Sequence, residues 1–214
     1  MEHTTAKQER ANYLTHLAGI VFCVVAIPVL TVYAGLKGTA GTMWAVCIFG
    51  FGMFTVYLSS TLYHAAEKEQ LKRVLRVWDH ISIFFLIAGS YTPFVVKFIK
   101  PDTALLFLSI MWGIVVVGII KKLFFTGRLE FLSVMLYLGM GWMAVFILKP
   151  MLQTMPLEIF WWILAGGLFY TLGIVFYVWK RWKYHHAIWH CFVLGGTVSH
   201  YFAVLFSVPV NTKL

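Results

Sequence analysis

The sequence predicts an all-α membrane protein, a seven-transmembrane helix bundle with a cytoplasmic N-terminus and an extracytoplasmic C-terminus. Of its 214 residues, 61% are hydrophobic and only 12% are charged, and the mean hydropathy is +0.83. Soluble domains carry roughly a quarter charged residues, so lipid must be the solvent for much of this chain. Seven long apolar runs and an uneven distribution of Lys and Arg complete the evidence for this fold.

The apolar runs define the helices in order. A helix needs about 20 apolar residues to cross the hydrocarbon of a bilayer, and short segments rich in Gly, Pro or charge, such as GLKGTAG and KRWKY, separate the runs. Barrel strands would alternate over roughly 10 residues, and these runs do not. We expect one transmembrane domain over residues 13–208, with a short cytoplasmic N-terminus at 1–12 and an extracytoplasmic C-terminus at 209–214. The expected spans are 13–34, 42–64, 79–99, 103–120, 130–148, 157–179 and 185–208.

The basic residues predict the orientation. With seven crossings, twelve Lys and Arg fall on the side of the N-terminus and five fall on the other. Cytoplasmic loops carry the excess of positive charge, so the N-terminal side is predicted to be cytoplasmic and the membrane to be the cell's plasma or inner membrane. The five on the other side are Lys37, Lys97, Lys100, Lys149 and Lys213.

The formal net charge of +9 does not indicate nucleic-acid binding, because the basic residues lie in short loops between apolar runs. Topology explains them better than a nucleic-acid surface does. Membrane lipids are the partners that the composition predicts. Neither a protein partner nor an oligomeric state can be inferred from the sequence.

Four ionisable residues lie inside the predicted membrane spans, where the surroundings are expected to be lipid. His64 closes the second span, Asp79 opens the third, and His186 and His190 open the seventh. The first three lie about 5 Å inside the nearest boundary charge and His190 lies about 10 Å inside, at 1.5 Å per residue. Ionisable groups inside a membrane are costly, so each is a candidate functional residue. Their similar depth predicts one site near the cytoplasmic leaflet.

The residue types at that depth indicate a metal site. His186 and His190 are four residues apart and share one helix face, as in the H-E-x-x-H pair that binds zinc. Three His with a fourth position open to water form a typical catalytic zinc site. Asp79 is then a candidate fourth ligand, directly or through water, or a general base that orients the water. Ser60, one turn before His64, is a candidate for a supporting hydrogen bond to a ligand.

Simpler roles remain open for these residues. Histidines at helix ends often lie at the headgroup level and bind nothing, Asp79 has the right type to cap a helix N-terminus, and Ser60 has a size suited to helix packing. We expect His16 to be structural or to lie at the lipid interface. His80 points about 100° away from Asp79 on a helix and is not expected to be a ligand. His200 lies about 15 Å beyond His190, so it is expected to hydrogen-bond another helix.

The motifs together resemble a known family. SSTLYH, WDHISIFFLIAGSYTPF and HHAIWHCFVLGGTVSH, with ERANYLTHLAG near the start, resemble the haemolysin III family of bacterial membrane proteins. That family belongs to the progestin and adipoQ receptor superfamily, which includes the adiponectin receptors. The resemblance covers nearly the whole chain, with its motifs in the expected order.

The resemblance implies a zinc ion near the inner leaflet, held by His64 of the S-x-x-x-H motif that Ser60 begins, and by His186 and His190. It also implies that Asp79 contacts the zinc, directly or through water. Unlike the eukaryotic receptors, this chain has only about a dozen residues before its first span, so we do not expect adiponectin-like signalling.

Three functions follow as hypotheses. The first, which the superfamily resemblance implies, is a zinc-dependent hydrolase of a lipid amide or ester, or a zinc-binding regulator of membrane lipid homeostasis. The second is a pore-forming cytolysin, as the family name indicates, although a secreted pore-former must stay soluble before insertion and this composition gives no soluble form. The third is a receptor or sensor without catalysis, for which the outer loops are very short.

Overall fold

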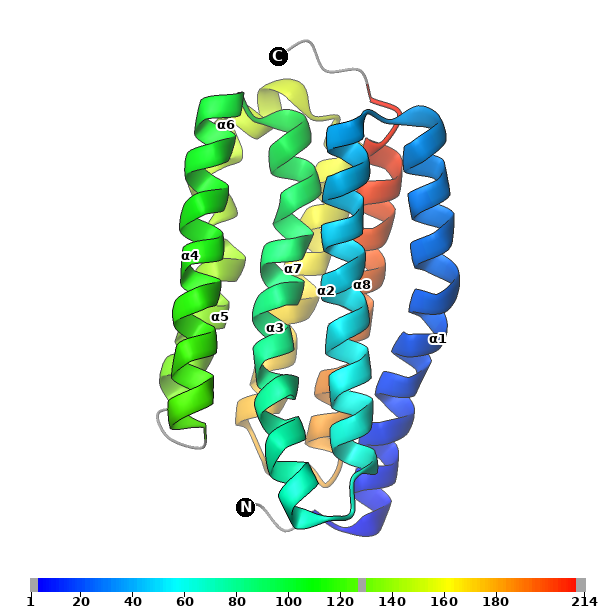
Figure 1. Cartoon of the computed structure of the whole chain (residues 1–214), viewed down its shortest axis with the longest axis vertical. Coiled ribbons are helices and arrows are strands. Elements are labelled where there is room, and N and C mark those ends of the chain that lie inside the picture. Colours follow the sequence, from blue (N-terminus) through cyan, green and yellow to red (C-terminus); the bar gives the residue numbers. More distant parts are fainter. Residues whose placement is uncertain (1–3, 127–129, 211–214) are drawn as a thin grey trace.

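The protein is a bundle of long helices, and its computed structural model describes residues 4–126 and 130–210. No strand occurs in these ranges (Figure 1). Arg128, one of the twelve basic residues assigned to the N-terminal side, and residues 211–214, which include Lys213 and the predicted C-terminal segment, lie outside the described residues. The helices are α1 (Ala6–Lys37), α2 (Ala40–Ala65), α3 (Glu69–Phe98), α4 (Pro101–Phe125), α5 (Glu130–Trp142), α6 (Ala144–Thr154), α7 (Leu157–Val178) and α8 (His185–Ser207).

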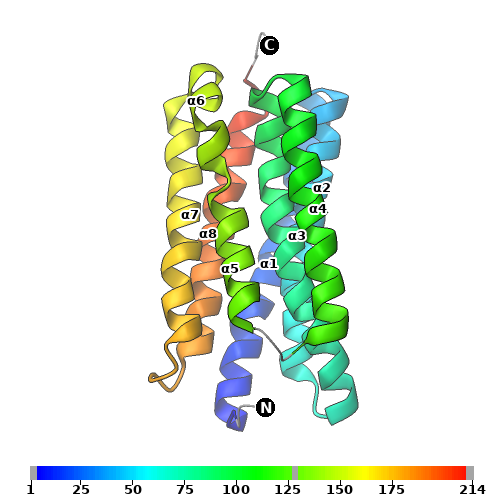
Figure 2. The ribbon, with the colours of Figure 1, turned by 90° about the vertical axis from the view of Figure 1, so that its left-hand side faces the viewer.

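Seven segments of the described chain are long and apolar enough to cross a membrane, which confirms the predicted fold class. α5 and α6 together form the fifth of these segments, and each other helix forms one. The segments run alternately up and down, so α1 begins and α8 ends at opposite ends of the bundle (Figures 1 and 2). The assignment of the N-terminal end to the cytoplasm stays a prediction.

Two helices begin well before the apolar runs that predicted them. α1 starts at Ala6 because Thr5 and Gln8 form a capping box, in which each side chain binds the other residue's backbone N–H. α3 starts at Glu69, so Asp79 lies almost three turns inside it rather than at its first residue. The prediction that Asp79 opens this helix was therefore wrong, and a capping role is excluded. Apolar content measures the membrane-buried part of a helix, whereas the helix itself continues through polar residues.

The fifth span is broken between α5 and α6, which the sequence did not predict. Met143 interrupts the helix, and the Tyr91 hydroxyl from α3 serves both sides of the break. It donates to the Gly141 carbonyl at 2.5 Å and accepts from the Ala144 amide at 3.0 Å. A break at membrane depth is tolerated where another helix binds the freed backbone groups, and Tyr91 does this here.

Three helices form the centre of the bundle. The buried share of the most apolar window is 67% in α3, 56% in α2 and 50% in α8, against 17% to 28% in the other spans. The outer helices expose large apolar side chains, such as Phe131 at 77% and Phe146 at 83%. Such surfaces need lipid around them, which agrees with a membrane-spanning bundle.

α2 and α3 approach closely because glycine lies at their contact. A Cβ atom at Gly52 would lie 2.6 Å from the Phe85 carbonyl oxygen, and one at Gly89 would lie 3.1 Å from the Ile48 carbonyl oxygen. Small residues let helix backbones meet in this way. The contact brings the C-terminal end of α2, which carries His64, beside the part of α3 that carries Asp79.

Candidate metal centre

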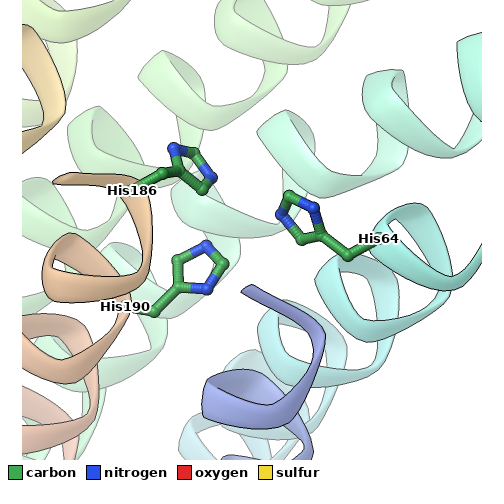
Figure 3. A group of neighbouring side chains, drawn as sticks. All are labelled: His64, His186 and His190. Carbon is green, nitrogen blue, oxygen red and sulfur yellow. The ribbon is translucent and has the colours of Figure 1, made fainter. Parts of the chain in front are cut away.

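Three histidines from two helices converge at the N-terminal end of the bundle. His64 lies one residue before the end of α2, and His186 and His190 lie in the first two turns of α8. The ring centroids are 5.3 Å apart for His64 and His186, 5.2 Å for His64 and His190, and 4.5 Å for His186 and His190. Figure 3 shows one nitrogen of each ring pointing toward the other two rings. The predicted grouping of these residues is therefore present.

The donor set suits a single metal ion. One ring nitrogen from each histidine lies within 4.8 Å of those from the other two. Nitrogens bound to a tetrahedral zinc at 2.0–2.1 Å lie roughly 3.4 Å apart, so ring movements of about 1 Å bring them to bonding distance. The Nε2 atom of His64 is buried and has no hydrogen-bond partner among the described residues. An unpaired buried acceptor is costly, and a metal ion would satisfy it.

Groups of α1 form hydrogen bonds with the Nδ1 atoms of two of the three rings. The His64 Nδ1 atom lies 2.7 Å from a carboxylate oxygen of Glu9. The His190 Nδ1 atom lies 3.1 Å from the Asn12 carbonyl oxygen and 3.0 Å from the Thr15 hydroxyl. Carboxylate and carbonyl oxygens only accept hydrogen bonds, so Nδ1 carries the hydrogen in both rings. In both rings, Nε2 then carries the free lone pair.

Asp79 and Ser60 lie beside the histidines. Both line the cavity that His186 and His190 also line, and Ser60 is completely buried. The Ser60 hydroxyl approaches the Asp79 carboxyl group from α2 without reaching the geometry of a hydrogen bond. Asp79 is not part of the three-residue group that could share one ion. Whether Asp79 would contact an ion directly or through water therefore stays a prediction.

The other histidines divide into near and distant ones. His16 is 3% exposed and stacks on His190 with ring centroids 3.5 Å apart, so it does not lie at the lipid interface. His80 lines the cavity but does not join the three-histidine group. His200 lies 3.2 Å, through Nε2, from the Ile163 carbonyl oxygen of α7. This confirms the expected hydrogen bond to another helix.

The sequence reasoning missed the contribution of α1. It named no role for Glu9, Asn12 or Thr15, and it expected His16 to be structural or to lie at the lipid interface. The spacing of Glu9, Asn12 and His16 by three and four residues puts them on one helix face, and that was the available signal. Glu9 and Asn12 were left out because the predicted span was defined by its apolar residues and therefore began at residue 13.

An apolar cavity of about 250 Å³ extends from His186 and His190 into the bundle. Asp79, His186 and His190 line one end, and Met155 and Phe160, at the junction of α6 and α7, line the other. Residues of α3, α5, α6 and α7 form most of its wall. A second pocket lies on the other side of His64 and is lined mainly by polar residues, among them Glu9, Arg10, Glu67 and Lys72.

Known proteins resemble this chain over almost its whole length. A family model described as Haemolysin-III related matches residues 4–201. The "Hemolysin-3 homolog" of Bacillus subtilis is 40% identical over 94% of this chain and 95% of its own length. "Hemolysin-3" of Bacillus cereus is 37% identical over 94% and 92%. The human "Monocyte to macrophage differentiation factor" is 28% identical over 94% and 84%.

Proposed function

The chain belongs to the haemolysin-III-related family, and from this premise we propose that it is a zinc-dependent membrane hydrolase that cleaves an amide or ester bond of a membrane lipid. One observation carries the proposal. Three convergent histidines, with Asp79 and Ser60 beside them, stand at the end of an apolar cavity inside a membrane bundle. A structural metal site needs no such cavity, whereas a lipid-cleaving site does.

Each group has a distinct role in this mechanism. His64, His186 and His190 would hold the ion, which when bound polarises a carbonyl group and activates water. Asp79 orients the attacking water and accepts its proton. Ser60, whose hydroxyl has no partner among the described residues, supplies a hydrogen bond to Asp79 or to the reacting oxygen. The apolar wall binds the acyl chain and excludes bulk water from the reaction.

The proposed reaction takes place at the cytoplasmic leaflet. This placement rests on the excess of Lys and Arg at the N-terminal end. A reporter that is active only in the cytoplasm, fused to the C-terminus, is expected to give no signal. A strong signal would reverse the orientation and move the metal centre to the other leaflet.

The test combines metal analysis with lipid turnover. Protein purified in nanodiscs with the host's own lipid extract should contain about one zinc ion per chain. It should release free fatty acid, measured by mass spectrometry. Asp79→Asn should retain the metal, with affinity lowered no more than about 10–100-fold, and should release no fatty acid. The amide keeps the size of the side chain but cannot accept the proton.

Two results would contradict this function. Wild-type protein that neither contains nor takes up a stoichiometric metal ion would remove its basis. Metal-loaded protein that leaves every lipid of the extract intact would instead favour the regulator of membrane lipid homeostasis, in which the same site binds a lipid without cleaving it.

A pore is the alternative that the relative's name "Hemolysin-3" favours. If pore formation is intrinsic, the purified protein should release dye from loaded liposomes, and His190→Ala should release as much as wild type. The hydrolase predicts negligible release at the same ratio of protein to lipid. Strong release that a metal chelator does not change would decide for the pore.

A further inference from the structure

The first three turns of α1 contact α2, α3 and α8 around the three histidines, although α1 carries none of these histidines. We propose that Glu9 is a positioning residue of the candidate metal centre, and that it acts with Asn12 as a brace that orients the ligands of α2 and α8. The inference rests on the proposed function only in requiring that the three histidines bind a metal ion.

The first contact of the brace fixes His64. The Glu9 carboxylate accepts a hydrogen bond of 2.7 Å from His64 Nδ1–H, and the two side chains are 20% and 3% exposed. This bond selects the tautomer with a free lone pair on Nε2 and sets the angle of the ring. A carboxylate behind a ligating imidazole also makes the ring more basic and a stronger ligand. Glu9 thus determines which atom His64 presents to the ion.

The second contact fixes His190 in the same way. Its Nδ1–H points at the Asn12 carbonyl oxygen at 3.1 Å, one turn of α1 after Glu9. The Thr15 hydroxyl donates to backbone carbonyls of α1 and so accepts from the same ring nitrogen, at 3.0 Å. By binding Nδ1 of His64 and His190, this face of α1 leaves Nε2 of both rings free to bind the ion. The orientation of two ligands, one on α2 and one on α8, therefore depends on the position of α1.

The brace is itself held in place. Lys72 of α3 binds the other Glu9 oxygen at 2.9 Å, and Thr4 donates to that same oxygen at 2.6 Å. The Gln8 side-chain amide donates to the Lys183 carbonyl oxygen at 2.5 Å, in the loop that leads into α8. The start of α1 is thus bound to α3 and to the segment just before His186. A carboxylate held on both oxygens has little freedom to swing away from His64.

A brace of this kind should affect metal affinity rather than folding. Glu9 lies partly exposed at the end of the bundle beside the polar pocket, so its loss removes few packing contacts. Without it, His64 can rotate or adopt the other tautomer, and a fraction of the protein no longer presents Nε2. Loss of such an outer contact typically lowers metal affinity by about 10–100-fold.

The test measures zinc affinity in full-length protein in nanodiscs, by competition with a chelating dye. Glu9→Ala is expected to raise the zinc Kd about 10–100-fold. Glu9→Gln, whose amide oxygen can still accept from His64, should lie between Glu9→Ala and wild type. The cobalt-substituted protein should show an altered visible absorption spectrum in Glu9→Ala, because one ligand has lost its fixed orientation.

Glu67 provides the matched control. It lines the same pocket three residues after His64, and it forms no hydrogen bond or ion pair with the residues that the structure describes. Glu67→Ala removes the same charge from the same pocket, so it should leave both the zinc Kd and the cobalt spectrum unchanged. An equal loss of affinity in both variants would reduce the effect of Glu9 to general electrostatics and overturn the positioning role.

Thermal unfolding separates the brace from a purely structural contact. With Glu9 as a positioning residue, metal-free Glu9→Ala and metal-free wild type should melt at similar temperatures, and added zinc should stabilise the variant less. If the metal-free variant is strongly destabilised while its zinc Kd equals that of wild type, the positioning role is wrong. Wild type that binds no metal would instead refute the proposed function, which is a separate outcome.

Discussion

The candidate metal centre and the cavity behind it are built in opposite ways. At the centre, polar groups of α1, α2, α3 and α8 are bound to one another through hydrogen bonds and an ion pair. In the cavity, the walls are largely apolar, and α5, α6 and α7 contribute few fully buried residues. The difference separates two tasks. A metal ion needs ligands fixed to within a fraction of an ångström, whereas an acyl chain needs only apolar space.

This comparison predicts that substitutions at the centre should change metal binding, and that substitutions in the cavity should change lipid binding without changing metal binding.

The largest effect is expected at the ligands themselves. His64→Ala and His190→Ala should reduce the zinc content from about one ion per chain to nearly none, because two nitrogens are too few for tight binding. A metal ion bound by these histidines would link α2 to α8 only in the folded bundle, so its loss should also destabilise the protein. At a metal concentration a thousand times the Kd the stabilisation is about 4 kcal/mol. Elemental analysis and thermal unfolding measure the two effects.

His80→Ala and His200→Ala are the controls for the ligand substitutions. Both residues lie along the same cavity but outside the three-histidine group, so both variants should bind zinc fully. A chelator should lower the melting temperature of wild type and of these controls, but not that of a variant without the three ligands. Full zinc content in His64→Ala would mean that the centre is not the metal site.

A smaller effect is expected from filling the cavity. Gly167 lines it, and a Cβ atom there would meet nothing within 4 Å, so Gly167→Leu should extend into the space without a clash. Excess volume in an apolar pocket lowers affinity by about tenfold or more, which competition with a fluorescent fatty acid measures. Zinc content should stay at the wild-type level.

Gly113 is the matched control for the cavity substitution. A Cβ atom there also meets nothing within 4 Å, but the residue is exposed on α4, outside the cavity. Gly113→Leu should therefore leave fatty-acid binding unchanged. Equal losses in the two variants would show that the bound fatty acid is not in the cavity.

The smallest effect is expected at the break in the fifth span. Tyr91→Phe removes two hydrogen bonds to the backbone at Gly141 and Ala144. Hydrogen bonds between membrane helices contribute about 0.6 kcal/mol on average, so the loss should be on the order of 1 kcal/mol in the free energy of unfolding. Tyr33→Phe is the control, since its hydroxyl forms no hydrogen bond in the described ranges. Equal stability of Tyr91→Phe and wild type would show that water or lipid replaces these bonds.

The sequence alone predicted the number of spans and the three histidines that the structure brings together. Apolar run length and helical spacing are local properties, because the bilayer fixes how many residues a helix needs and 3.6 residues per turn fixes which side chains share a face. His186 and His190 face the same way for this reason. His64 joins them because the alternating direction of the spans brings the end of the second to the start of the seventh.

Only the tertiary structure decided what supports those ligands. The contacts of Glu9 with His64 and of Asn12 with His190 join residues 55 and 178 positions apart. They depend on how α1 is rotated against α2 and α8. The break at Met143 also depends on another helix, because Tyr91 of α3 binds the freed backbone groups. The packing of helices against one another depends on the fit of many side chains at once, and the pattern within a single helix does not specify it.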